Sequence, residues 1–254
     1  AGLAEGGNTR RLLGDDVAGK IDRILTQYSG LFETLSTAPS ALNTLLGGDE
    51  PKRYLILGQS SDEVRPAGGF TSSVWVMTLV DGALDDIEYI NVITFGENDA
   101  LAKLPNPPEE LVTYMDARSW YLRDVGWSPD FRSVAETALR MNEAAGHKPV
   151  DGVISLTQWA FVYMVDGFGS IDTPNGELVG SQVMTAIEEG TDTEGTNFLQ
   201  SMFDSMIDSL TADRLESNFV PFTRSMLRAF DEKQIMIYAT DSELEKQLVD
   251  LGWA

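Results

Sequence analysis

The sequence contains no cysteine and only one histidine among its 254 residues. The absence of cysteine excludes disulfides, thiol catalysis and thiolate metal sites. His147 follows a predicted helix end, where a histidine is typically a surface residue favoured by the helix dipole. We therefore predict neither a histidine-based triad nor a transition-metal site. A metal here would be a hard cation held weakly by carboxylates, Mg²⁺ or Ca²⁺, and Mg²⁺ is the candidate cofactor.

Basic residues are scarce. Eighteen lysines and arginines stand against forty acids, which gives a net charge of -22. This balance excludes nucleic acid as a partner and disfavours anionic membrane surfaces, because both require a basic face. The bases are also unevenly placed: none lies at positions 149–213, whereas arginines stand at 118, 123, 132 and 140. Two interpretations stay open, since these arginines either serve a site or pair with nearby glutamates.

Long apolar runs are absent too. No stretch approaches the roughly 20 residues of a membrane span, and no signal peptide is visible. If the protein is exported or anchored, we expect that segment to lie outside this chain. Three common catalytic motifs are also missing: the Gly-x-Ser-x-Gly elbow, the Walker-type phosphate loop and the His-Glu-x-x-His pair.

The residues that are present predict one α/β domain over residues 15–254, preceded by a flexible segment at 1–14. Hydrophobic residues make up 43% of the chain, enough for a large core. Apolar runs predict strands near residues 54, 75, 90, 153 and 236, alternating with capped helices after an initial hairpin at Asp81-Gly82. This alternation is typical of a mixed central sheet with helices on both faces.

The first candidate site segment is "SSDEVRPAGGFTSS", residues 60–73, which separates two predicted core strands. A plain hairpin needs two to five residues and no arginine. Gly68 and Gly69 permit unusual backbone angles and can expose N–H groups beside the Arg65 guanidinium, a combination that suits an anion. The alternative is a glycine-rich connection in which Arg65 pairs with a nearby acid.

The second candidate segment is "YLRDVGWSPDF", residues 121–131. Arg123 and Asp124 are predicted to end a strand, and Ser128 to cap a helix with proline in its first turn. Ligands of open α/β sheets gather at such strand ends, beside helix N-termini. If the two segments lie side by side, Arg65 and Arg123 form a phosphate or carboxylate site. The alternative is that Asp124 and Asp130 neutralise the arginines.

The order of four segments resembles a bacterial family, domain-of-unknown-function family 4012. They read "YLILGQSSDEVRPAGGF", "LRDVGWSPDF", "VDGVISLTQWAFVYMVDGFGSI" and "QIMIYATDSELEKQLVDLGW", and they cover about residue 50 to the end. The resemblance implies an extracytoplasmic, membrane-tethered protein of the cell envelope, although this chain lacks the family's N-terminal membrane helix.

That family is in turn similar in layout to the LytR-CpsA-Psr phosphotransferases. This similarity implies a LytR-CpsA-Psr-like fold, a polyprenyl-phosphate glycolipid or cell-wall polymer as partner, and a lipid tail buried beneath the sheet. In those enzymes arginines and aspartate-bound Mg²⁺ act on the pyrophosphate. The chain departs from them in two places: Thr71, Ser72 and Ser73 stand where they carry a metal-binding aspartate, and residues 196–206 lack their arginine pair.

We therefore expect an envelope domain that binds an anionic or pyrophosphate-linked glycolipid around Arg65 and Arg123. The lost charges leave open whether it is an enzyme, because phosphoryl transfer depends on them. The alternative is a non-catalytic structural or protein-interaction module whose loops serve as scaffolding.

Overall fold

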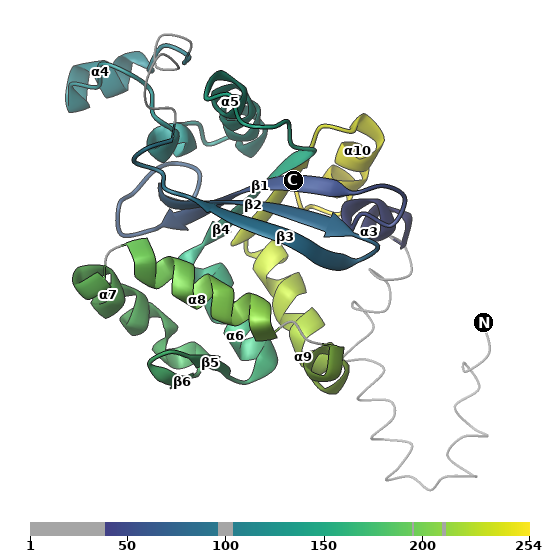
Figure 1. The fold of residues 1–254 in the computed structure, drawn as a ribbon. Helices are drawn as coiled ribbons and strands as arrows, with labels where there is room; N and C mark the ends of the chain where they lie inside the picture. The colour runs from purple at the N-terminus through teal and green to yellow at the C-terminus, as the bar shows by residue number, and fades with distance from the viewer. Residues whose placement is uncertain (1–38, 96–103, 195, 210–211) are drawn as a thin grey trace, which may run out of the picture. The chain divides into compact units, whose positions relative to one another are not determined.

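A five-stranded mixed sheet forms the centre of the fold (Figure 1). The computed structural model describes residues 39–95, 104–194, 196–209 and 212–254. The sheet has the order β3-β2-β1-β4-β7. Its strands are β1 (Lys52–Ser60), β2 (Phe70–Val80), β3 (Ala83–Ile90), β4 (Gly152–Thr157) and β7 (Ile235–Ala239). The predicted five strands and mixed α/β class are confirmed, since β1 pairs parallel to β4 while the other pairs are antiparallel.

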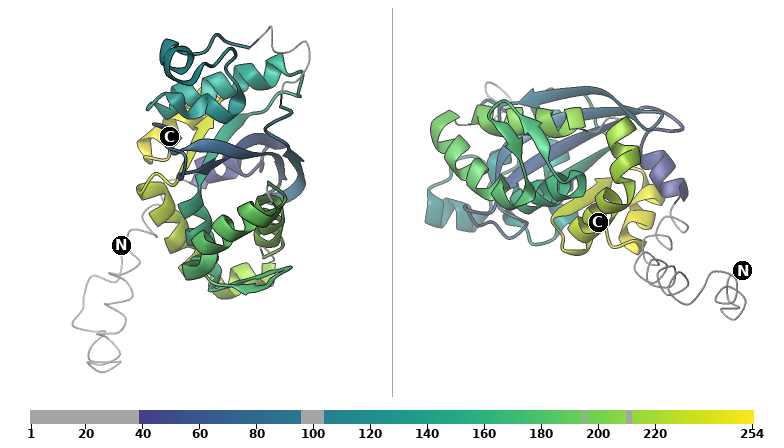
Figure 2. Two further views of the ribbon diagram at one scale, coloured as in Figure 1. Left: turned by 90° about the vertical axis from the view of Figure 1, so that its left-hand side faces the viewer. Right: turned by 90° about the horizontal axis from the view of Figure 1, so that it is seen from below.

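Helices cover both faces of this sheet (Figure 2). Helix α5 (Phe131–Ala144) lies on one face, and α6 (Gln158–Phe168), α8 (Thr196–Ser209) and α9 (Ala212–Asp231) lie on the other. The remaining elements are α3 (Pro39–Leu45), α4 (Glu109–Met115), the 3₁₀ helices η2 (Leu122–Trp127) and η3 (Gly180–Gln182), α7 (Val183–Glu194), α10 (Ser242–Asp250) and the small hairpin β5 (Ile171–Thr173) and β6 (Gly176–Leu178). Helix α7 was not predicted. The spacing of Val17, Ile21, Ile24 and Leu25 predicts a further helix from residue 15, and this segment lies outside the described residues.

The prediction of a strand that ends at Arg123 and Asp124, within residues 119–127, is wrong, because residues 122–127 form the 3₁₀ helix η2. Leu122 and Val125 carry its buried apolar side chains and are 1% and 0% exposed. Their spacing of three places both on one side of a helical turn, whereas a strand would point them to opposite faces. The Trp120 indole N–H donates to the Asp124 carbonyl at 3.0 Å and closes the turn.

The two faces of the sheet are packed differently. Alternate residues of β1 and β2, such as Leu55, Leu57, Val74 and Val76, join the apolar face of α5 in one continuous buried cluster. The residues between them point to the opposite face, toward α6, α8 and α9. Two cavities lie on that second face.

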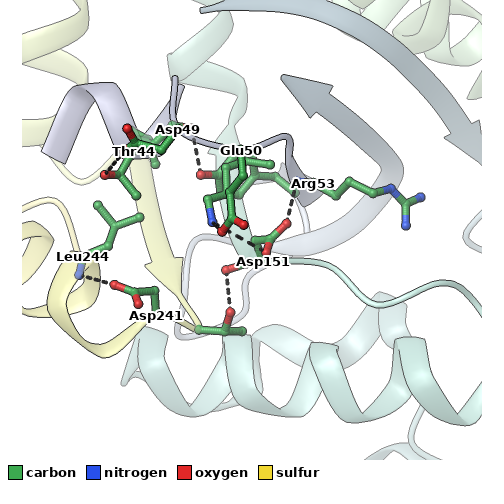
Figure 3. Close-up of polar contacts among 11 residues, drawn as sticks. Thr44, Asp49, Glu50, Arg53, Asp151, Asp241 and Leu244 are labelled. Atoms are coloured by element: carbon green, nitrogen blue, oxygen red, sulfur yellow. Dashed lines mark hydrogen bonds and ion pairs between the residues drawn. The ribbon is translucent and has the colours of Figure 1, made fainter. Parts of the chain in front are cut away.

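The amino ends of the parallel strands are held by paired charges (Figure 3). The Asp151 carboxylate accepts from the Arg53 backbone N–H at 2.8 Å, and its carbonyl accepts from Thr240 N–H at 2.8 Å. The buried Lys52 ammonium donates to Glu50 at 2.6 Å, and this hydrogen bond raises the lysine pKa. Because these groups fulfil one another's hydrogen-bonding and charge requirements, this end of the sheet has a structural role.

The β2–β3 hairpin turns at Asp81-Gly82, as predicted. Both residues have positive φ, 51° and 79°, which is the type I′ geometry that matches strand twist.

Within the described residues, no helix is long and apolar enough to cross a bilayer.

Candidate functional site

The loop between β1 and β2 is fixed by two glutamines that the sequence analysis did not identify. Gln59 is 2% exposed, and its amide donates to the Ala67 carbonyl at 2.7 Å while accepting from the Ser155 hydroxyl at 2.7 Å. Gln158 begins α6 and accepts from the Ser61 hydroxyl at 2.6 Å. The sequence pattern that could have identified them is a polar residue at the end of the apolar strand β1 and another at the start of the apolar helix α6.

The two candidate segments do lie side by side. The Ala67 N–H donates to the Gly126 carbonyl at 3.1 Å, so the β1–β2 loop rests on η2. Gly69 has a φ of 136°, and a Cβ there would lie 2.0 Å from the Ser60 carbonyl oxygen. A Cβ on Gly68, at a φ of 97°, would lie 2.4 Å from the Gln59 amide oxygen. The glycines therefore serve close packing of the loop.

Arg65 is paired with Asp124. Its Nη2 and Nε lie 2.8 Å and 3.1 Å from the same carboxylate oxygen, and the two side chains are 9% and 13% exposed. A shielded arginine already joined to a carboxylate has little capacity left for a ligand. For Arg65 the structure therefore agrees with the alternative interpretation, in which an aspartate neutralises the arginine.

Arg123 is placed differently. Its Nε lies 3.6 Å from Asp124, its guanidinium stacks 4.7 Å from the Tyr121 ring centre, and its side chain is 41% exposed. It lines a cavity of about 390 Å³ at the carboxyl ends of β1 and β4. Neither Arg65, Gly68, Gly69, Asp124 nor Ser128 lines this cavity, so of the predicted site residues Arg123 is the one that faces it.

Ser128 does not cap the following helix, and this prediction is wrong. Helix α5 begins at Phe131 and its N-cap is Asp130, whose carboxylate accepts from the Ser133 N–H at 3.0 Å. The Ser128 hydroxyl instead accepts from the Asp130 N–H at 3.2 Å, before the helix begins. Serine and aspartate are both favourable N-cap residues, so the sequence offers Ser128 and Asp130 equally. The helix begins at Phe131, and the residue directly before it, Asp130, is therefore the cap.

The rim of the cavity carries both signs of charge. Asp62, Glu63 and Glu188 line it together with Arg123. The Asp62 carboxylate accepts from the Gln158 amide at 3.0 Å. Over the described ranges there is no group of three acids or histidines close enough to hold a metal ion. Mg²⁺ is nevertheless commonly held by one or two carboxylates plus ligand phosphates, so the rim fits Mg²⁺ only together with a phosphate-bearing ligand.

The interior of the cavity is mainly apolar. Trp75, Phe161 and Ile187 form its apolar walls. The Ser73 hydroxyl and the Trp75 indole N–H are buried and have no hydrogen-bond partner. The cavity can thus take a molecule with an anionic head near Arg123 and an apolar body inside.

Comparison with known proteins gives one family and several distant structures. The family model described as "Protein of unknown function (DUF4012)" matches residues 49–191. Solved structures that overlap with the chain include Bacillus subtilis TagV, with 12% identity, a TM-score of 0.43 and coverage of 80% of this chain and 78% of that one. A LytR-Csp2A-Psr enzyme from Actinomyces oris has 10% identity, a TM-score of 0.39 and coverage of 79% and 74%. The Lin1025 protein from Listeria innocua has 12% identity, a TM-score of 0.43 and coverage of 79% and 77%.

These structural scores are too low to carry an argument about activity. The family match is different in kind, because it spans more than half of the chain and includes the β1–β2 loop, η2, β4 and α6. It therefore confirms the resemblance found in the sequence: the chain belongs to the DUF4012 family.

Proposed function

We propose that the cavity beside Arg123 binds an amphiphile with a phosphate or pyrophosphate head and an apolar chain, as in a polyprenyl-linked glycolipid of the cell envelope. The observation that carries the proposal is a half-exposed arginine at the rim of a cavity with apolar walls. Guanidinium offers forked donors that match phosphate oxygens. An extracytoplasmic location is part of the same proposal and rests on the family resemblance.

Binding, rather than catalysis, is proposed here. Phosphoryl transfer needs several positive charges around the reacting phosphate. At the start of β2 this chain has Thr71, Ser72 and Ser73, and the Ser72 hydroxyl donates to the Gly58 carbonyl at 3.3 Å. The cavity lining contains one base against three acids. Mg²⁺, if it takes part, would be held by Asp62 or Glu63 together with the ligand, and would offset this negative charge.

A second candidate function is a protein-interaction module without a small ligand. The Arg65–Asp124 pair favours it, because one of the two predicted ligand arginines is already used inside the protein. In that case the loop and η2 serve as rigid scaffolding for a binding surface.

Calorimetric titration with a short-chain polyprenyl pyrophosphate analogue, with and without Mg²⁺, separates the two candidates. Replacing Arg123 by Ala should weaken binding by about 1.5 to 3 kcal/mol, the usual scale for a hydrogen bond to a charged group. Arg118→Ala is the matched control, since Arg118 is exposed, lies outside the cavity and changes the net charge equally. Absence of binding to the wild type, or equal losses in both variants, would overturn the proposal and leave the interaction module as the better candidate.

A further inference from the structure

A second cavity lies beneath the same face of the sheet. Its volume is about 290 Å³, and every residue around it is apolar. It lies between the sheet and helices α6, α8 and α9, with four methionines among its walls: Met77, Met164, Met206 and Met226. An apolar lining of this kind favours hydrocarbon over water.

The two cavities follow one another along the same strands. On β1, Gly58 lines the first cavity and Ile56 lines the second. On β2, Trp75 lines the first and Met77 lines the second. Residues two apart on a strand share a face, and Trp75 pairs with Ile56 in the sheet register. The boundary between the cavities therefore falls at Trp75.

A stack of aromatic rings forms this boundary. The Trp75 ring covers Gly58, where a Cβ would lie 2.7 Å from a ring carbon. Phe203 of α8 stacks on Trp75 with ring centres 4.4 Å apart, and Phe161 of α6 meets Phe203 edge-on at 6.2 Å. Because Trp75 lines the first cavity and Phe203 the second, this pair stands between them.

Packing alone holds the Trp75 ring in place. Its indole N–H is buried without an acceptor, although the Tyr89 ring lies edge-on at 5.9 Å and its hydroxyl is also unpaired. Moving the indole therefore breaks no hydrogen bond of its own. The hydrogen bonds that fix the rim involve neither Trp75 nor Phe203.

We propose that Trp75 and Phe203 determine the length of the apolar chain that this protein accepts. This inference rests on the proposed function, in which the first cavity receives the head and the beginning of the chain. With the pair in place, the chain ends at the Trp75 ring. With the pair removed, the chain continues into the second cavity. Each cavity is near or below the lower end of the usual size of ligand pockets, and the joined space lies within that range.

A series of alkyl phosphates from about six to about eighteen carbons tests the proposal, because each newly buried methylene should tighten binding about fourfold. For the wild type, the gain per carbon should stop at the length that reaches Trp75. For Trp75→Ala and for Phe203→Leu, the gain should continue to longer chains. Phe203→Leu guards against a folding failure of the larger truncation.

Phe222→Leu is the matched control, since Phe222 lines the second cavity but pairs with Phe168 rather than with Trp75. It should keep the wild-type length limit. Methyl NMR of the four cavity methionines gives an independent readout: long chains should shift these signals in the partition variants and leave them unchanged in the wild type.

Three outcomes overturn the inference. One is the same length limit in the wild type and both partition variants, with binding retained, which would leave the proposed function standing. Another is a shift of the methionine signals by long chains in the wild type, which would show that the pair is no barrier. The last is absence of alkyl phosphate binding to every form, which would overturn the proposed function as well.

Discussion

Arg65 and Asp124 stand 59 positions apart in the chain, yet their side chains meet in a largely shielded ion pair with an N–O distance of 2.8 Å. The same carboxylate also lies 3.6 Å from Arg123. One aspartate thus ties the β1–β2 loop to η2 and touches both arginines of the predicted site. Because Arg65 is shielded and Arg123 is half-exposed, the two should respond differently to replacement.

Arg65→Ala should destabilise the fold, by about 3 kcal/mol, because removing one partner of a buried pair leaves a desolvated charge. Arg123→Ala should change the free energy of unfolding by less than about 1 kcal/mol, as expected for an exposed pair. Urea denaturation of the two variants and the wild type measures both. Equal losses would show that Arg123 is a structural partner of Asp124 rather than a ligand group.

Gly69→Ala should be more damaging than Gly82→Ala. Both positions have positive φ, 136° and 79°, which costs a side-chain-bearing residue about 1 to 2 kcal/mol. At Gly82 an added Cβ meets nothing within 4 Å, whereas at Gly69 it meets a backbone oxygen at 2.0 Å. The melting temperatures of the two variants should therefore differ, with Gly69→Ala lower. Similar values would mean that the loop shifts freely and is not fixed on η2.

Gly58→Ala should destabilise the protein through Trp75, by about 1 to 3 kcal/mol, because the new methyl group overlaps the indole ring. Trp75→Leu in the same chain should make the Gly58 substitution less costly. A double-mutant cycle on the free energy of unfolding gives this coupling. Additive effects would contradict the close contact between Gly58 and the indole.

Asp130 should contribute to the acid sensitivity of the fold. Hydrogen bonds from the Ser133 hydroxyl and N–H hold the pKa of this carboxyl below its usual value. Its stabilising effect is therefore complete above the unfolded-state pKa of about 4 and is lost as the pH falls through the lower folded-state pKa. Asp130→Asn keeps an N-cap acceptor but removes the titration.

The free energy of unfolding of Asp130→Asn should thus fall less steeply than that of the wild type as the pH decreases below about 4. Denaturant titrations at several pH values measure the two slopes. Parallel slopes would show that Asp130 is not a source of the acid sensitivity.

The sequence by itself determined the strands and several turns, because these depend on neighbouring residues. The apolar run from Tyr54 to Leu57 predicts a buried strand, and Asp81-Gly82 predicts the hairpin, in agreement with the structure. An aspartate before an apolar-periodic segment indicates a helix N-cap, and Asp241 caps α10, where its carboxylate accepts from the Leu244 N–H at 2.7 Å. These signals are local: hydrophobic period, turn chemistry and capping.

Tertiary structure alone decided which polar groups meet and where space remains. Arg65 could have paired with Asp62 or Glu63 nearby, but the docking of its loop on η2 brings Asp124 to it instead. Segment 122–127 became a 3₁₀ helix because both of its buried side chains face the same core. The Trp75–Phe203 partition joins β2 to a helix more than 120 positions later, and no local pattern encodes such a contact. Long-range packing fixes these partners, since the free energy of each contact depends on the neighbours that the whole fold supplies.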